Sequence, residues 1–382
     1  MLVVNVNQCR FMALRSLRSW RPENGVQRHR QLDTTQGAAS NGPVSPAGKS
    51  NLGRNLPMWF NRTLFAAVGL TATLSMQLAL AQPSGVECIA PSDPGGGWDF
   101  TCRSVGRLLE EQDRVDGSVK VTNMSGGDGG VGMSYVVSKR NEDPNLLVAA
   151  STATISNLAQ DRYTGLDHEA VRWVASLGAD FGAIVVREDS PYENLNQLLD
   201  DVMEDPSQVS FGGGSVAGTW DDLKVRLLAK AAGMEDIADI NYVAFNSGGP
   251  AQTQLLGGHI DAYTGDFSEI AGQLEAGNVR VLAILAPERL AAAPDVPTAI
   301  EQGYDVIGAN WRGFYAPGNI SDEEYQEWVS ILGELYQSEG WQEAMEANGL
   351  GPFWQGGEEF GEFVDQNIEQ LVETSREVGV LE

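Results

Sequence analysis

The chain has 382 residues, of which 42% are hydrophobic and 20% are charged, so it has the material for a sizeable core and the length for about two domains. Its formal net charge of −27 repels phosphate groups, which argues against nucleic acid and anionic membranes as partners. The three Cys and three His residues show no zinc-finger spacing, CxxC pair or HExxH motif, so we expect neither a metal nor a cofactor.

Residues 58–81 are typical of a secretory signal peptide. A basic start at Arg62 precedes an apolar stretch from 64 to 80, and small residues at 79 and 81 form a cleavage site before Gln82. An uncleaved anchor is the alternative, but interspersed Thr, Ser and Gln residues make this short stretch a marginal bilayer span. We therefore expect an exported, soluble protein whose mature chain begins near Gln82.

Residues 1–57 precede that segment, although a signal peptide belongs at the N-terminus. They contain eight Lys and Arg, two acidic residues and a Ser/Gly/Pro-rich run from 34 to 50. We interpret them as a non-native extension from a misassigned start, with Met58 as the initiator. The alternative is an organellar transit peptide, which has the same Arg-rich, acid-poor composition.

The remaining 301 residues are strongly acidic. They hold 16 Lys and Arg against 50 Asp and Glu, which gives a formal charge of −34, and four of the bases are lysines. Such a surface suggests a protein that stays soluble in concentrated salt.

Export places Cys88 and Cys102 in an oxidising compartment, where a disulfide between them is expected. The closed loop of about 15 residues would contribute roughly 3 kcal/mol of stability. Two buried free thiols are the alternative.

Strand and helix patterns alternate through residues 82–382, which predicts an α/β fold with parallel-type sheets flanked by helices. The first series has strands near 86–90, 118–123 and 145–151 and helices near 103–112 and 129–139. The second has strands near 183–188, 209–214, 240–245, 260–265 and 279–285 and helices near 194–203, 220–233, 250–258 and 267–277. The tail adds a strand near 306–315 and helices at 322–347 and 357–378.

No Pro/Gly/Ser-rich linker separates the two series. We therefore expect two extended crossings, near 173–183 and 281–287, that form a two-strand hinge between lobes. The predicted domain 1 is residues 82–177 plus 284–382, and domain 2 is residues 178–283. A ligand would lie in the cleft between them.

Four glycine-rich turns each follow a predicted strand and open a predicted helix, at residues 94–99, 125–130, 212–219 and 246–250. Glycine lets the backbone approach a ligand closely, and the free N–H groups at a helix start favour an anion. Two turns from each series would converge on one cleft, so this acidic protein can still bind a carboxylate. Tight turns that only pack are the alternative for any one of them.

The sequence lacks two residues that nucleotide-binding sites require, so we expect no nucleotide site. Gly127, Gly129 and Gly132 form G-x-G-x-x-G, but no acidic residue ends the next strand to contact a ribose. The same segment lacks the Lys of a P-loop before Ser134.

Several polar residues beside the turns have both a ligand and a structural interpretation. Thr152 and Asp266 are candidates that could each simply cap a helix, and Asp99 suits the start of a helix. Arg312 is a candidate or a surface cation. Trp98 is too large for the interior of a tight turn, so we expect it to form a wall of the pocket.

Catalytic signals are absent from the sequence. It has no G-x-S-x-G elbow and no unpaired Cys nucleophile, and His168 and His259 lie in segments that look structural. We therefore interpret this exported, two-lobed protein, with its anion-binding turns and no catalytic motif, as a solute receptor rather than an enzyme.

Several motifs together resemble the substrate-binding receptors of tripartite tricarboxylate transporters, over residues 83–380. The resemblance is carried by PGGGWDFTCR, SGGDGG, NSGGP followed by LLGGHIDA, AGNVRVLAILAPERL, VPT with EQGYDV, and WRGFYAP. It implies a Venus-flytrap, Bug-type periplasmic binding protein. Its partners would be a small mono-, di- or tricarboxylate and integral membrane permease subunits, and we expect it to be a monomer.

In that family, loop backbone groups hold the ligand carboxylate. The resemblance carries this role to Gly96, Gly97, Trp98, Asp99, Gly127, Asp128, the turn that contains Ser215, Gly218 and Thr219, and the turn of Asn246, Ser247, Gly248 and Gly249. Trp98, Asp128 and Asp266 depart from the common pattern. Two added carboxylates argue against citrate and favour a smaller acid, an aromatic acid against Trp98, or a zwitterion whose amine meets Asp266. An exported sensor that presents a small acid to a signalling partner is the alternative function, and a periplasmic enzyme on the same fold is a third.

Overall fold

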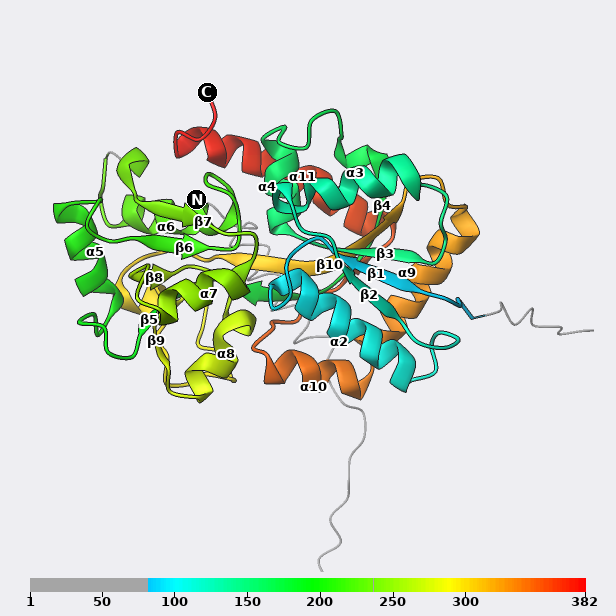
Figure 1. The fold of residues 1–382 in the computed structure, drawn as a ribbon, viewed down its shortest axis with the longest axis horizontal. Helices are drawn as coiled ribbons and strands as arrows, with labels where there is room; N and C mark the ends of the chain where they lie inside the picture. The colour runs from blue at the N-terminus through cyan, green and yellow to red at the C-terminus, as the bar shows by residue number, and fades with distance from the viewer. Residues whose placement is uncertain (1–81, 236) are drawn as a thin grey trace, which may run out of the picture. The chain divides into compact units, whose positions relative to one another are not determined.

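The computed structural model describes residues 82–235 and 237–382, which fold into two mixed β-sheets flanked by helices (Figure 1). The predicted extension at 1–57, the signal peptide at 58–81 and its cleavage site lie outside the described residues. In the described part, no helix is both long enough and apolar enough to cross a membrane.

The first sheet has the strand order β11-β4-β10-β3-β1-β2. Its strands β1 to β3 are parallel, whereas β10 is antiparallel to both β3 and β4. The strand bounds are β1 Glu87–Ala90, β2 Lys120–Asn123, β3 Leu146–Ser151, β4 Val171–Phe181, β10 Ala309–Pro317 and β11 Gln355–Gly356. β3 is buried along its whole length, which explains its unbroken apolar sequence.

The second sheet has the order β7-β6-β8-β5-β9. Here β6 is parallel to β7 and β8, and β5 is antiparallel to β8 and β9. The strands are β5 Ala183–Arg187, β6 Phe211–Gly213, β7 Tyr242–Ala244, β8 Ala262–Tyr263 and β9 Val279–Ile284. The prediction of a two-lobed α/β fold is confirmed, with the refinement that both sheets are mixed. We call each sheet with its helices a lobe.

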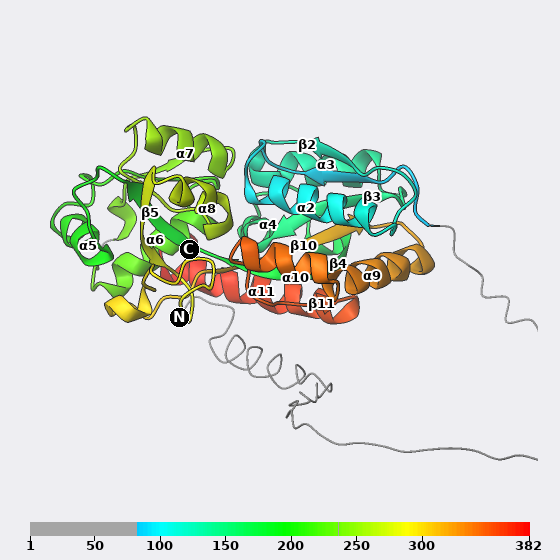
Figure 2. The ribbon, with the colours of Figure 1, turned by 90° about the horizontal axis from the view of Figure 1, so that it is seen from below.

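The helices of the first lobe are α2 Gly97–Glu111, α3 Gly130–Lys139, α4 Thr152–Ala159, α9 Asp322–Tyr336, α10 Glu339–Ala347 and α11 Glu358–Glu377. Those of the second lobe are α5 Leu195–Glu204, α6 Trp220–Ala231, α7 Gly248–Leu256 and α8 Phe267–Glu275. Short 3-10 turns lie at Gly127–Gly129, His168–Ala170, Ile237–Asp239 and Ile300–Gln302. Figure 2 shows α5, α7 and α8 at the left of the view and α2, α3 and α9 at the right.

The sequence of α2 explains why it forms and where it lies. Its buried residues Cys102, Val105, Leu108 and Leu109 recur at helical spacing and turn one apolar face toward the sheet. A disulfide between Cys88 of β1 and Cys102 fastens this face to the strand, with the two Cα atoms 5.7 Å apart. The predicted disulfide is thus confirmed.

The predicted helix at 322–347 is wrong, because the chain breaks it into two helices. α9 ends at Tyr336, and Ser338 begins α10 by accepting a hydrogen bond from the Trp341 N–H. Serine competes with the helical backbone for hydrogen bonds and favours such an N-cap position.

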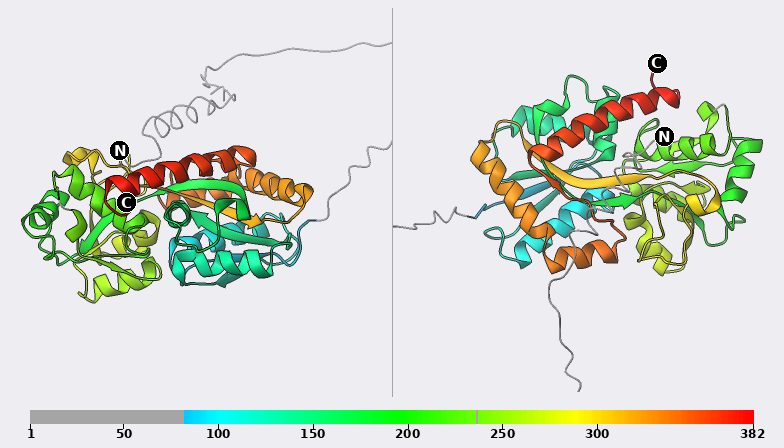
Figure 3. Two further views of the ribbon diagram at one scale, coloured as in Figure 1. Left: turned by 90° about the horizontal axis from the view of Figure 1, so that it is seen from above. Right: turned by 180° about the vertical axis from the view of Figure 1, so that it is seen from behind.

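Two extended segments lie side by side where the chain passes between the sheets. β4 ends at Phe181 and β5 begins at Ala183, with Gly182 alone between them. The Leu285 N–H, just after β9, donates to the Gly182 carbonyl at 2.7 Å, and the Gly308 N–H donates to Leu285. The C-terminal helix α11 also extends toward the second lobe (Figure 3). The predicted domain boundaries and hinge motion remain predictions.

Candidate ligand-binding pocket

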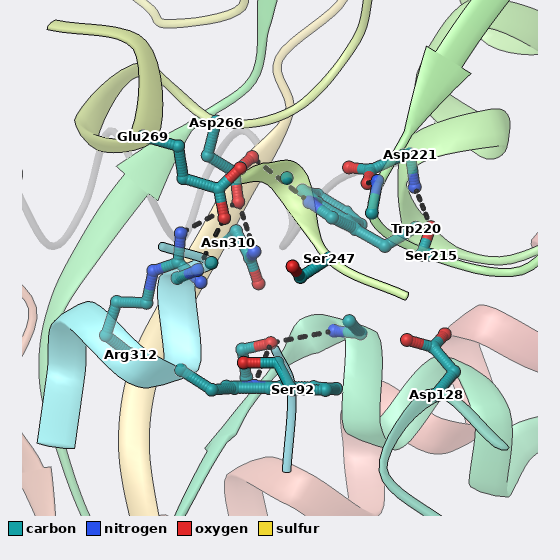
Figure 4. A pocket seen from close by; sticks show the side chains of 17 residues that line it. Ser92, Asp128, Ser215, Trp220, Asp221, Ser247, Asp266, Glu269, Asn310 and Arg312 are labelled. Carbon is teal, nitrogen blue, oxygen red and sulfur yellow. Dashed lines mark hydrogen bonds and ion pairs between the residues drawn. The ribbon is translucent and has the colours of Figure 1, made fainter. Parts of the chain in front are cut away.

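A pocket lies at the ends of the strands where the two lobes meet, with a cavity of about 40 Å³. Cavities of this size hold a few water molecules. Its lining comes from both lobes and includes many polar side chains (Figure 4). The lining residues are Ser92, Gly96, Gly97, Trp98, Asp128, Ser151, Ala153, Gly214, Ser215, Trp220, Asp221, Ser247, Gly248, Asp266, Glu269, Asn310 and Arg312.

All four glycine-rich turns reach this pocket, as the sequence predicts. The turns before α2 and α3 come from the first lobe, and those before α6 and α7 come from the second. The first and fourth turns approach closely, because a Cβ added to Gly249 would lie 3.0 Å from the Pro94 carbonyl oxygen. The helix starts of both lobes therefore face one cavity.

Two buried serine hydroxyls in the pocket have no partner among the residues that the structure describes. Ser92 and Ser247 are each 3% exposed, and both Oγ atoms lack a hydrogen bond there. Ser247 is the N-cap of α7, but its side chain makes no capping bond. Because a buried hydroxyl without a partner costs about 1 to 3 kcal/mol, these two groups are suited to a ligand.

Trp98 forms one wall of the pocket, where the sequence predicts it. The side chain is 6% exposed, and its indole N–H donates to Ser151 Oγ at 3.1 Å. Ser151 also caps α4 by accepting from the Ala153 N–H. The ring is therefore fixed in place by the element that follows β3.

Asp266 lies at the centre of a buried cluster that joins the two lobes. Its Oδ1 accepts from the Lys224 ammonium at 2.9 Å and from the Trp220 indole at 3.2 Å. Its Oδ2 accepts from Asn310 at 2.5 Å and from the Arg312 guanidinium at 3.0 Å. Burial alone raises the pKa of Asp266, but Lys224 and Arg312 outweigh it and hold this pKa below its ordinary value.

Both cations of this cluster have a second carboxylate partner. Lys224 lies 2.9 Å from Asp221 Oδ1, and Arg312 donates to Asp180 Oδ2 at 2.8 Å. Burial disfavours the charge of Lys224, yet Asp221 and Asp266 raise its pKa. The cluster therefore keeps its charges paired inside the protein.

Asp128 bridges the lobes on another side of the pocket. It belongs to the second turn, and its Oδ2 accepts from Asn157 at 2.7 Å, from Thr219 Oγ1 at 3.2 Å and from the Val216 N–H at 3.4 Å. Burial raises the pKa of Asp128 to about 6, and the nearby charge of Asp221 adds to the shift.

Glu269 crosses from α8 to the start of α2. Its Oε1 accepts from the Gly97 N–H at 2.5 Å, and its Oε2 accepts from the Tyr263 hydroxyl. Burial raises the pKa of Glu269 to about 7, and the neighbouring Asp266 raises it further than the Tyr263 hydrogen bond can lower it.

The structure brings eight of the predicted site residues to the pocket lining: Gly96, Gly97, Trp98, Asp128, Ser215, Ser247, Gly248 and Asp266. It places the other seven outside that lining: Asp99, Gly127, Thr152, Gly218, Thr219, Asn246 and Gly249. Their role in ligand binding remains a prediction.

Several of the residues outside the lining have structural partners. Asp99 accepts from the Gly95 N–H and from Arg103 near the start of α2. The Thr152 N–H donates to Asn310 Oδ1, and Thr219 is the N-cap of α6. The structural interpretation of Asp99 therefore agrees with the contacts.

Sequence reasoning missed five polar or aromatic lining residues: Ser92, Trp220, Asp221, Glu269 and Asn310. Arg312 was a candidate, but its alternative as a surface cation is wrong, because the side chain is 3% exposed. The zwitterion hypothesis is also weakened, because both oxygens of Asp266 already accept from cations of the chain. A signal for Glu269 was its place in the first turn of the helix after Asp266.

No group of three or more His, Cys, Asp and Glu side chains is arranged to hold a metal ion within residues 82–235 and 237–382. His168 lies 3.1 Å from Asp365, and His259 is exposed; neither lines the pocket.

Comparison with protein families identifies the class to which this fold and pocket belong. The family described as "Tripartite tricarboxylate transporter family receptor" matches residues 109–379, and the chain belongs to this family of solute-binding receptors. A curated relative, Protein BugT of Bordetella pertussis, is 26% identical over 319 residues, which cover 82% of this chain and 94% of that protein.

Solved structures share the fold. The periplasmic binding protein BugD matches with a TM-score of 0.69 and 22% identity, covering 78% of this chain and 98% of that one. MatC from Rhodopseudomonas palustris, with bound malate, matches with a TM-score of 0.66 and 19% identity, covering 76% and 99%. Both likenesses support the two-lobed architecture.

Proposed function

We propose that this protein is a periplasmic receptor that captures a small organic carboxylate between its lobes and delivers it to a tripartite tricarboxylate-type membrane transporter. The observation that carries the proposal is the pair of buried hydroxyls, Ser92 and Ser247, which lack partners in the described residues beside the starts of α2 and α7. Hydroxyl donors beside two helix N-termini suit a carboxylate.

The charges of the lining limit which acid is favoured. Four carboxylates line the pocket, those of Asp128, Asp221, Asp266 and Glu269. Arg312 in the lining and Lys224 just outside it are the two cations that offset these charges. A ligand with several negative charges meets repulsion here, even where backbone N–H groups accept one carboxylate. We therefore expect an acid of low charge rather than citrate, with its apolar part against Trp98.

Family membership supports the transport role and the exported location. MatC, which has the same architecture, contains malate in its solved structure. The Cys88–Cys102 disulfide agrees with an oxidising compartment outside the cytoplasm. We also propose that domain 1 (82–177 plus 284–382) and domain 2 (178–283) close about the two extended segments that pass between the sheets, one at Gly182 and the other at Gly308.

The proposal is tested by native mass spectrometry of the purified protein, followed by thermal shifts and calorimetry with six acids. The panel is acetate, lactate, benzoate, malate, adipate and citrate. Binding to the folded state raises the melting temperature, so a carried-over acid or a concentration-dependent shift is expected. A folded protein that carries no acid and responds to none of the six, at low and at molar salt, contradicts the proposed function.

A further inference from the structure

Glu269 reaches from the second lobe to the start of a helix in the first. It lies in the first turn of α8, and its Oε1 accepts from the Gly97 N–H at 2.5 Å. Gly97 is the first residue of α2, a helix of 15 residues whose N-cap, Gly96, provides no side-chain hydrogen bond. The carboxylate that meets this helix start therefore comes from the opposite lobe.

This position favours an anion for reasons that do not depend on Glu269. The first N–H groups of a helix have no acceptor within the helix, and the helix dipole is positive there. Ser92 and Ser247 lie beside the same point, because a Cβ added to Gly96 would lie 3.4 Å from Ser92 Oγ and 2.9 Å from the Ser247 Cβ. Both hydroxyls are buried and unpartnered among the described residues.

The surrounding residues leave room for the Glu269 carboxylate. Its second oxygen accepts from the Tyr263 hydroxyl, so both oxygens are oriented by donors. A Cβ at Gly248 would collide with that second oxygen. The glycine at the start of α7 is therefore necessary for this arrangement.

The charges around Glu269 oppose its ionised form, so the carboxylate of a ligand can displace it from the helix start. Asp266 and Asp221 lie near enough to oppose its ionisation, and Arg312 favours it. Burial and the two aspartates prevail, which raises the pKa of Glu269 to about 7. A second carboxylate cannot join this one at the same helix start without strong repulsion.

We infer that Glu269 is a tethered carboxylate that occupies the anion position of the pocket and sets its specificity, so that an acid binds when its own carboxylate replaces Glu269 on the Gly97 N–H. This inference rests on the proposed function. At the helix start, the incoming acid exchanges one carboxylate for another. Its gain there is only the difference between the interaction free energies of its own carboxylate and of Glu269 with the Gly97 N–H. Its remaining binding free energy has to come from contacts that Glu269 does not make, such as those to Ser92 and Ser247.

The test compares the wild-type protein with Glu269→Gln and Glu269→Ala by calorimetry with each of the six acids named above. Gln keeps the size of the side chain but removes its charge, and Ala removes the competing group altogether. The control is Glu275→Gln, the same change at an exposed position on the same helix. Thermal melts establish that each variant is folded.

The expected result is that the acid bound by the wild type binds about tenfold more tightly to Glu269→Ala, a size typical of a carboxylate at a helix N-terminus. Glu269→Gln is expected to show a smaller gain in the same direction, and Glu275→Gln no change. Equal or weaker binding to both Glu269 variants overturns the inference while the proposed function stands. Absence of binding to wild type and folded variants alike contradicts both.

Discussion

The two sides of the pocket differ in whether their buried polar groups have hydrogen-bond partners within the chain. Around Asp266, both carboxylate oxygens accept hydrogen bonds from buried groups of the chain, including Lys224 and Arg312. Around the starts of α2 and α7, the Ser92 and Ser247 hydroxyls are equally buried and have no partner in the described residues. We call these the bonded side and the open side.

The difference shows that charge in a pocket is not by itself a sign of ligand contact. A buried carboxylate whose two oxygens both accept hydrogen bonds from cations of the chain stabilises the arrangement of the two lobes, and its removal leaves uncompensated charges. A buried hydroxyl without a partner has a cost that a ligand can remove. Stability should therefore respond to the bonded side and affinity to the open side.

The largest expected effect is on the bonded side. Asp266→Asn keeps the shape of the side chain but leaves Lys224 and Arg312 with one carboxylate partner fewer. We expect the free energy of unfolding to fall by about 3 to 5 kcal/mol, measured by urea denaturation. Glu275→Gln, an exposed change on α8, should alter it by less than about 0.5 kcal/mol. Equal stabilities of Asp266→Asn and wild type would remove the distinction between the two sides.

The next effect concerns the support of the open side. The Cys88–Cys102 disulfide fastens β1 to α2, and the start of α2 carries Gly97 and Trp98. Replacing both cysteines by serine is expected to cost roughly 3 kcal/mol of stability, because the unfolded chain gains the freedom of a loop of about 15 residues. Wild-type protein should show the same loss when reduced with dithiothreitol. If neither the double substitution nor the reduction lowers the melting temperature, the disulfide does not stabilise the protein as proposed.

A pH dependence is expected where Glu269 joins the two sides. Because its pKa is raised from 4.5 to about 7 in the folded protein, the folded state holds a proton that the unfolded state has released between these values. Its contribution to stability therefore falls as pH rises from 4.5 to 7, by at most about 1.4 kcal/mol for each pH unit.

Glu269→Gln removes this titration. Melting temperatures are measured from pH 4.5 to 8. The melting temperature of the variant minus that of the wild type should rise up to about pH 7 and stay constant above it. Asp128→Asn should show the same trend at lower pH, because the pKa of Asp128 is raised to about 6. A difference that does not change with pH would contradict the assignment for Glu269.

The smallest expected effect is on the open side. Ser92→Ala and Ser247→Ala should each weaken binding of the acid by a few-fold, because each removes one hydrogen bond, worth about 0.5 to 1.5 kcal/mol. Stability without the acid should stay equal or rise, since an unpartnered buried hydroxyl is lost. Ser134→Ala, at an exposed position on α3, is the control for calorimetry and melts. Lower stability with unchanged affinity would reverse the roles of the two sides.

Local sequence predicted much of the fold. The alternation of strands and helices, the glycine turns that begin α2, α3, α6 and α7, and the crossing at Gly182 all depend on neighbouring residues. The break at Ser338 was missed because its helical pattern continues on both sides, and only the capping tendency of serine marks it. The antiparallel pairing of β10 was also missed, since sheet order depends on residues far apart in the chain.

The pocket residues also fall into a predictable and an unpredictable group. The turn residues that line the pocket are visible in the sequence as glycine-rich motifs, but the roles of Arg312 and Glu269 can be seen only once their partners in the fold are known. Arg312 pairs with a residue 132 positions away, and Glu269 meets Gly97 across 172 positions. Such pairings arise from the closure of two lobes, and no local pattern encodes them.

The most direct test is a crystal structure of the protein with the acid that the binding panel selects. The account predicts the carboxylate of that acid within hydrogen-bond distance of the Gly97 N–H, Ser92 Oγ and Ser247 Oγ. It also predicts that Glu269 has left Gly97, while Asp266 keeps its contacts with Lys224 and Arg312. An acid bound elsewhere, or one that binds through Asp266 and leaves the two serines without a partner, would contradict it.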